Sequence, residues 1–316
     1  MIDAHRQREQ KWVAVMSSVQ PSQSRKSKKV KKLLLDGVPA SVRYLVWSHV
    51  TDGRARIVAG VYARLGSRGR VPASELIEKD LVRYFKEYPQ LQGLQSPVLV
   101  LLQAYMSMVP DVQYSAGLTL IVGQLLLQGP EEEVFWIFVS LMDSYLRPYF
   151  SFMSQQLEVD SALFGRALEA NDGQVAKKVL LELSIPPSEI CSSWFTSVFV
   201  ENLPTGYVNR VWDLFMYEGI PFLMRVGLAI INCCRRILLE CTSDASVLEV
   251  LHHPPSRLLP PNPDALVTLA LSQKLKDDDV RKQRIKMEAQ VKRQTQAQQA
   301  PRKTAAAPAS ISLPKT

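Results

Sequence analysis

Residues 77–83 read Ile-Glu-Lys-Asp-Leu-Val-Arg, a stretch that fits both an amphipathic helix and a charged site. Ile77 and Leu81 are four residues apart, so on a helix they share a face that can pack into a core. Asp80 and Arg83 are three apart and would be neighbours on the helix surface. Such a pair is either an ordinary surface contact, worth about 0.2–0.5 kcal/mol, or a guanidinium held ready for a phosphate group.

Helical patterns extend from this stretch in both directions. Apolar residues recur at intervals of three and four, and glycine or proline interrupts them at residues 37–39, 109–110, 128–130, 186–187 and 219–221. No run of alternating strand residues stands out. The sequence therefore predicts an all-α fold with a single large helical domain over residues 33–250. It predicts a basic, flexible leader at residues 1–32, and a proline-rich linker, basic helix and disordered tail at residues 251–316.

The positive charge of the chain lies at its two ends. The formal net charge is +8, with +7 in residues 1–32 and +7 in residues 274–316, which leaves −6 for the residues between them. A nucleic-acid-binding domain carries its own basic face, so the acidic body argues against nucleic acid as a partner. The leader is either simply solvated or weakly attracted to anionic lipid. Residues 274–293 form either a solvated helix face or a partner- or membrane-binding helix.

The sequence offers little for small-molecule catalysis. No GxxxxGK[ST] phosphate loop, GxSxG elbow, HExxH or kinase signature occurs, and the chain has only four histidines. His252 and His253 are adjacent, so a helix would point them apart, and no cysteine lies near them to complete a metal site. The four cysteines have no paired spacing and are expected to be free thiols in a reducing setting. Without a signal peptide or an uninterrupted apolar span, we expect a cytoplasmic protein.

Five short motifs follow one another over about residues 33–240. They are Leu35-Asp36-Gly37-Val38-Pro39 with Arg43 and Trp47; Ile77-x-x-Asp80-x-x-Arg83; Glu132-Glu133-x-Phe135-Trp136; Trp194-Phe195-Thr196-x-x-Phe199 with Leu203-Pro204; and Val211-Trp212-Asp213-Leu214-Phe215 with Glu218-Gly219. This order resembles the TBC domain, the fold of Rab GTPase activators. The resemblance implies an all-helical domain that acts on GTP-bound Rab proteins in vesicle trafficking, in the cytoplasm or at the periphery of endomembranes.

Arg83 matches the arginine finger of that family. The resemblance implies that Arg83 enters the partner in trans and stabilises charge on the transferring phosphoryl group, an effect generally worth about 10³–10⁵ in rate. Asp80 would hold Arg83 in place. The motif residues better interpreted as structural support are Arg43, Trp47, Trp212 and Asp213. GTP and Mg²⁺ would belong to the partner, so the protein itself would need no cofactor or metal and would not itself be an enzyme.

The second finger of the family, a glutamine in a YxQG motif, is missing. Residues 114–117 read Tyr-Ser-Ala-Gly, so Tyr114 and Gly117 match as supporting residues, while Ala116 stands at the glutamine position. The alanine side chain has no donor or acceptor and cannot orient water. On a continuous helix Gln113 would point about 60° away from position 116, so we do not expect it to substitute.

A further departure follows Arg83. The chain has Tyr-Phe-Lys at residues 84–86, where the family usually has Thr-Phe-Pro, and its proline comes later, at Pro89. The loop after the finger is therefore expected to differ in shape.

Three functions remain open at this point. The first is a Rab GTPase activator that uses one finger, with the partner's own glutamine positioning the water. The second is a Rab-binding adaptor that has lost activity with its glutamine finger. The third is a helical scaffold with no GTPase partner. Arg83 and Ala116 are the residues whose substitution separates the first two.

Overall fold

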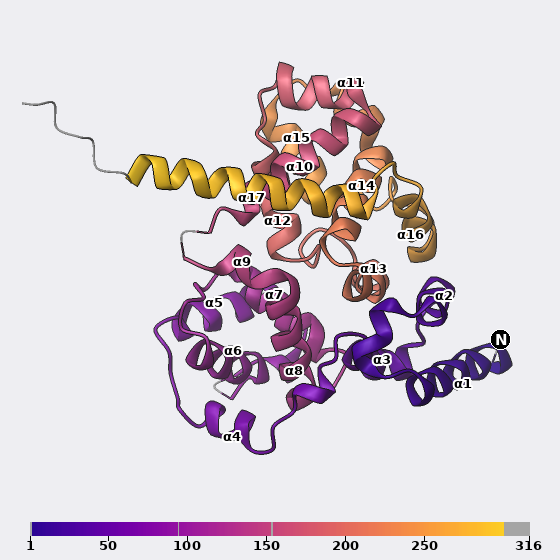
Figure 1. The fold of residues 1–316 in the computed structure, drawn as a ribbon, viewed down its shortest axis with the longest axis vertical. Coiled ribbons are helices and arrows are strands. Elements are labelled where there is room, and N and C mark those ends of the chain that lie inside the picture. The colour runs from indigo at the N-terminus through magenta and orange to yellow at the C-terminus, as the bar shows by residue number, and fades with distance from the viewer. Residues whose placement is uncertain (1, 94, 153, 300–316) are drawn as a thin grey trace, which may run out of the picture.

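The computed structural model describes residues 2–93, 95–152 and 154–299, and it confirms the predicted all-α fold (Figure 1). Within these ranges the β pairing is limited to an isolated bridge between Val112 and Ser151. The α-helices are α1 (Ile2–Ser18), α2 (Lys28–Asp36), α3 (Arg43–Val50), α4 (Val61–Gly66), α5 (Ser74–Tyr84), α6 (Pro97–Met108), α7 (Ala116–Leu126), α8 (Glu131–Leu141), α9 (Arg147–Phe150), α10 (Gln156–Asn171), α11 (Gly173–Ala176), α12 (Pro187–Thr196), α13 (Thr205–Glu218), α14 (Ile220–Glu240), α15 (Asp244–His252), α16 (Pro263–Leu271) and α17 (Asp277–Gln299). Short 3₁₀ segments are η1 (Pro21–Lys26), η2 (Ala40–Val42), η3 (Arg54–Arg56) and η4 (Pro89–Leu91), and π-helical segments are η5 (Met142–Leu146) and η6 (Lys177–Glu182).

The helices gather in two groups. Figure 1 shows α4–α8 in its lower part, α10–α12 and α14–α16 in its upper part, α13 between these groups, and α1–α3 to one side. Helix α13 contacts α14 as well as α3, and α3 in turn packs on α8, so the two groups share contacts through α3 and α13. The buried apolar side chains of both groups form one continuous cluster. The motif residues near positions 43–47 and 211–215 therefore lie where the two groups meet.

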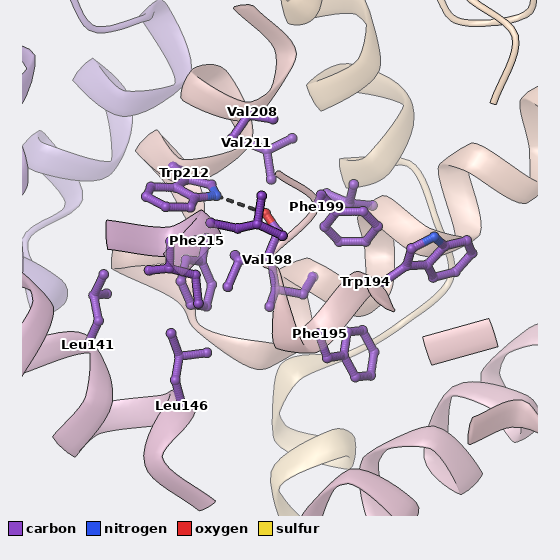
Figure 2. Packing of buried hydrophobic residues seen from close by; sticks show 14 of the residues in the cluster. Leu141, Leu146, Trp194, Phe195, Val198, Phe199, Val208, Val211, Trp212 and Phe215 are labelled. Atoms are coloured by element: carbon purple, nitrogen blue, oxygen red, sulfur yellow. Dashed lines mark hydrogen bonds between the residues drawn. The ribbon is translucent and has the colours of Figure 1, made fainter. Parts of the chain in front are cut away.

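An aromatic core fixes the turn that follows α12. Figure 2 shows the Trp212 indole, whose Nε1 donates a hydrogen bond to the Val198 carbonyl oxygen at 2.9 Å. Trp194 is fully buried, and its Nε1 donates to the Leu251 carbonyl oxygen at 3.0 Å. Val198 and Phe199 have φ angles of 49° and 63°, a region that few side chains adopt. Burial of both side chains and the Trp212 bond stabilise this turn, which passes close to α5.

The opening stretch of the sequence forms α5 as predicted. Ile77 and Leu81 are 0% and 2% exposed and face the core between α6 and α7. Phe85 follows the helix and lies against Gly123 of α7, where an added Cβ would come within 2.2 Å of the Phe85 ring. Any side chain at position 123 would therefore push the end of α5 away from α7. The apolar face of α5 is buried, so its other face is left to solvent.

The prediction of a flexible leader over residues 1–32 is wrong for residues 2–32. Helix α1 packs on α2 and α3, with Trp12 and Val15 both 1% exposed. The Trp12 Nε1 donates a hydrogen bond to the Gly37 carbonyl oxygen at 3.2 Å. The high average charge hid these two apolar residues, which are three apart and share a helix face. The N-terminal segment is thus part of the folded body, and its basic side chains lie mostly on the outside.

The C-terminal segment is also more ordered than predicted. Asn262 caps α16 by accepting the Ala265 N–H at 2.9 Å, and Pro263 occupies the first turn, a position that suits proline. Helix α16 packs on α13 and α14 and begins at Pro263, while the prolines at residues 254–255 and 260–261 lie in the segment between α15 and α16. The predicted basic helix is α17, whose first turns contact α10 and α14. The tail expected to be disordered lies at residues 300–316, outside the described residues.

No helix of the described ranges has the apolar length needed to cross a bilayer.

Candidate functional site

Arg83 lies in the last turn of α5, on the face turned to solvent. Its guanidinium carbon is 4.9 Å from the centre of the Tyr84 ring, a cation–π contact that orients the side chain. Within the described ranges no hydrogen bond or ion pair to Arg83 is found. The guanidinium therefore keeps its full set of N–H donors for a partner.

Asp80 does not hold Arg83 in this structure. Its Oδ2 accepts a hydrogen bond of 2.6 Å from the Tyr114 hydroxyl, which also lies 2.8 Å from the Thr119 hydroxyl. Burial, followed by the bond to Asp80, raises the pKa of Tyr114, so the phenol stays protonated and can donate. Asp80 and Tyr114 thus tie α5 to the segment before α7. The predicted surface pair is replaced by a partly buried contact between two of the motifs.

Gln92 caps the end of α5 that carries Arg83. Its Nε2 donates to the carbonyl oxygens of Leu81 and Phe85 at 3.0 and 2.7 Å. Each of these oxygens also accepts a backbone N–H, Leu81 from Phe85 and Phe85 from Tyr88, both at 2.9 Å, so Gln92 adds a second donor to each of them. The backbone beneath Arg83 is therefore held on both sides, by Gln92 and by the Phe85–Gly123 contact. No motif in the sequence pointed to Gln92.

Ala116 is the first residue of α7, and Gly117 is the second. A Cβ added at Gly117 would lie 2.2 Å from the Thr196 carbonyl oxygen, so only glycine allows α7 to meet the end of α12 this closely. Gln113 lies outside the helix. It is exposed, and its backbone N–H donates to the Phe150 carbonyl oxygen at 2.7 Å. Gln113 and Ala116 are therefore not on one continuous helix, and the expected angle of about 60° between them does not hold here.

Glu201 is an acidic residue near Arg83 that the sequence analysis missed. Its Oε1 accepts from the Tyr84 hydroxyl at 3.4 Å, and its Oε2 accepts from the Ser193 hydroxyl at 3.4 Å. Burial, followed by the charge of Glu201, raises the pKa of Tyr84. The turn at Val198 and Phe199 positions Glu201 beside Tyr84. No local sequence pattern predicts that turn. The ring beneath Arg83 is therefore fixed from a second element.

Arg43, Trp47 and Asp213 come together in a buried cluster between α3 and α13. One oxygen of Asp213, Oδ1, accepts from Arg43 Nε at 3.1 Å and from Trp47 Nε1 at 2.8 Å. The other oxygen lies 3.7 Å from Arg210 Nη1. Trp212 packs its ring 5.7 Å from that of Trp47. Asp213 is fully buried, so none of its bonds is accessible to a ligand.

Desolvation dominates the titration of Asp213. Its burial raises the pKa from 3.8 to about 6, although Arg43 and Arg210 both act to lower it. The cluster connects helices that are far apart in the sequence, and its chemistry is that of structural support. Arg83, in contrast, is exposed beside a fixed ring, on a helix whose end is capped.

The described residues contain no group of three or more His, Cys, Asp or Glu side chains arranged to hold a metal ion. The four cysteines are free thiols. What the site around Arg83 offers is a guanidinium on an open surface, able to approach an anionic group presented by another molecule.

Comparison with known proteins gives consistent results. The model of the Rab-GTPase-TBC domain family matches residues 41–239. TBC1 domain family member 10B of Mus musculus is 30% identical over 238 residues, which covers 73% of this chain and 30% of that protein. Carabin of Mus musculus is 30% identical over 257 residues, which covers 79% of this chain and 57% of that protein. The chain thus spans less than two thirds of the length of these relatives.

A solved structure has a similar fold. The TBC domain of a Chlamydomonas flagellar RabGAP aligns with a TM-score of 0.68 at 23% identity, over 78% of this chain and 84% of that chain.

Proposed function

This chain belongs to the Rab-GTPase-TBC domain family, and we propose that it activates GTP hydrolysis by a Rab-type GTPase in vesicle trafficking. Arg83 is the residue that carries the proposal. It is exposed at the capped end of α5, lies over the Tyr84 ring and has no ionic partner among the described residues. It stands at the arginine position of the family motif. The protein would work in the cytoplasm, at the periphery of endomembranes, on the GTP-bound state of its partner.

The chemistry follows from the guanidinium. A GTPase holds GTP and Mg²⁺ in its own site, and negative charge spreads over the γ-phosphoryl oxygens as the terminal bond breaks. Arg83 would enter that site from the surface of α5 and donate hydrogen bonds to those oxygens. Because the end of α5 is already fixed by Gln92 and Phe85, little conformational freedom is lost when the finger binds.

The attacking water needs a second group, and Ala116 cannot provide one. We propose that the glutamine of the GTPase itself positions the water, as in activation where only an arginine is supplied in trans. On this proposal, the segment at residues 114–117 serves to support α5, through the Tyr114–Asp80 bond and the close contact of Gly117.

The test is a single-turnover measurement of GTP hydrolysis across a panel of Rab proteins. The native chain should accelerate hydrolysis by at least one of them, and Arg83→Ala should abolish the acceleration. Arg64→Ala is the matched control, because Arg64 is an exposed arginine on α4 and bonds only to its own helix. An Arg83→Ala variant that accelerates hydrolysis as well as the native chain would refute the proposal.

Ala116 favours one alternative, a Rab-binding adaptor without activating power. In that case the native chain binds a GTP-bound Rab but leaves its hydrolysis rate unchanged, and Ala116→Gln alone confers acceleration. Ala116 is the first residue of α7 and only partly buried, so the larger side chain can be accommodated. The same panel therefore separates the activator from the adaptor.

A further inference from the structure

A basic cavity of about 230 Å³ lies away from Arg83, where the N-terminal segment meets α17. Its walls come from η1, η5, α13, α14 and α17, so both ends of the sequence contribute to it. The lining side chains that bear on its chemistry are Arg25, Tyr145, Tyr217, Glu218, Arg281 and Arg284. Three of these six are arginines.

Arg25 is the most unusual group in this cavity. Its guanidinium lies 4.9 Å from the centre of the Tyr145 ring, and its Nε and Nη2 atoms are buried without a hydrogen-bond partner among the described residues. A buried charged donor without a partner is unfavourable, because it has lost its water and gained no acceptor. Arg25 lines the cavity and has no ion pair among the described residues, so an anion bound there would supply its missing counter-charge.

The acidic side chain in the wall is already neutralised. Glu218 is almost fully buried, with Lys31 Nζ 3.0 Å from its Oε1 and Arg225 Nη1 2.8 Å from its Oε2. Both of its oxygens are therefore occupied by cations from outside the set of lining residues. Glu218 cannot also compensate Arg25.

The two arginines of α17 that line the cavity have different partners. Arg284 is paired with the buried Asp160, with Nε 2.9 Å from Oδ1. Arg281 is exposed, and its closest acidic contact is Asp278 of its own helix at 3.9 Å. Arg281 and Arg25 are therefore the cations left for a ligand. Burial raises the pKa of Tyr145 above its ordinary value, so its hydroxyl remains protonated as a donor.

We propose that this cavity binds a phosphate-bearing anion between Arg25 and Arg281. Two guanidinium forks match the oxygens of a phosphate group, and the Tyr145 hydroxyl of the wall adds a neutral donor. The π-helical segment η5 holds Tyr145 in the wall, and such segments are frequent at functional sites. The ligand would join η1 to α17 and so bind the two ends of the chain together. The proposal is independent of Arg83 and of the GTPase.

The shared chemistry is a phosphate group, which either a soluble polyphosphate or a lipid headgroup can supply. Isothermal titration with pyrophosphate tests the first source. Sedimentation with phosphatidylcholine vesicles, with and without a phosphatidylinositol bisphosphate, tests the second. Binding to pyrophosphate alone assigns a soluble ligand, and a gain restricted to the phosphoinositide vesicles assigns a headgroup.

Arg281→Gln and Lys282→Gln form a matched pair of variants. Both residues are exposed neighbours on α17, and each substitution removes one positive charge, but only Arg281 lines the cavity. We expect Arg281→Gln to weaken binding about tenfold or more, the usual effect of losing one charged hydrogen bond, and Lys282→Gln to stay within about twofold of the native chain. Arg25→Gln should weaken binding at least as much as Arg281→Gln, with helical content checked by circular dichroism.

Two results would overturn the proposal. One is the absence of binding to both probes. The other is an equal loss in Arg281→Gln and Lys282→Gln, which would mean that the ligand responds to the general charge of α17 and not to this cavity.

Discussion

Two aspartate–arginine pairs in this chain have the same spacing but different surroundings and partners. Asp80 and Arg83 are three apart on α5, and Arg210 and Asp213 are three apart on α13. In α13 the pair is buried, with Arg210 Nη1 3.7 Å from Asp213 Oδ2. In α5 the aspartate binds Tyr114, and the arginine lies in solvent over a tyrosine ring.

Burial, not spacing, decides what such a pair does. A buried carboxylate is unfavourable without hydrogen bonds or a counter-charge. Asp213 accepts hydrogen bonds from Arg43 and Trp47 and lies 3.7 Å from Arg210. An exposed arginine is solvated by water and remains free to be taken up by another molecule. The α13 pair should hence govern the stability of the fold, and the α5 arginine should govern activity.

Arg83→Ala should have the largest effect, and on activity alone. We expect the stimulated rate of GTP hydrolysis to fall by about 10³-fold or more, while the free energy of unfolding changes by less than about 0.5 kcal/mol. Single-turnover kinetics and urea denaturation of the same preparation give the two numbers. A large loss of stability in this variant would show that Arg83 supports the fold and does not act in activity alone. Arg64→Ala should change neither quantity.

Asp213→Ala should produce the opposite pattern. It leaves Arg43 without its buried counter-charge and removes the acceptor of the Trp47 N–H, while Arg210 keeps its ion pair with Asp264 at 2.6 Å. Removing one partner of a buried ionic cluster costs about 3–5 kcal/mol, which urea denaturation would detect as a lower midpoint. Asp213→Asn is the control, since the amide oxygen still accepts hydrogen bonds and should retain part of the stability. A loss below about 1 kcal/mol in the alanine variant would contradict the role of the cluster.

The pH dependence of stability gives a third contrast. Burial raises the pKa of Asp213 to about 6 in the folded chain from 3.8. The folded state then binds more protons than the unfolded state between these values, so this group makes stability fall as pH rises from about 4 to 6. A change in the Asp213 pKa from 3.8 to about 6 corresponds to about 3 kcal/mol of unfolding free energy. Native chain and Asp213→Asn should therefore differ in the slope of unfolding free energy over this range, and equal slopes would exclude Asp213 as its source.

The sequence predicted the parts of this molecule that rest on local periodicity and on matched motifs. Helix α5 forms where the spacing of Ile77 and Leu81 placed it, and the all-α class follows from the same kind of pattern. Spacing failed for Asp80 because the competing partner, Tyr114, is 34 residues away and no helix pattern can reveal it. The outcome depended on tertiary contact, which a local rule does not describe.

Gln92, Glu201 and the packing of the N-terminal segment were also not predicted from the sequence. Gln92 and Glu201 reach the site from segments that carry no motif. The position of Glu201 also depends on a turn with positive φ at Val198. The leader was misjudged because net charge averages over residues, and two buried side chains, Trp12 and Val15, are enough to dock a helix. The role assigned to Arg83 stays a prediction until the kinetic test is made.

The smallest predicted effect asks which partner Asp80 serves. A double-mutant cycle with Asp80→Ala and Tyr114→Phe should give a coupling energy of about 1 kcal/mol in unfolding, because the phenol donates to the carboxylate at 2.6 Å. The cycle of Asp80→Ala with Arg83→Ala should give less than about 0.3 kcal/mol. If the second coupling is the larger one, the i,i+3 pair forms in solution, and α5 resembles α13 more closely than its contacts suggest. If the first is larger, Asp80 serves the packing of α5 against residues 114–117, and Arg83 is left free for a partner.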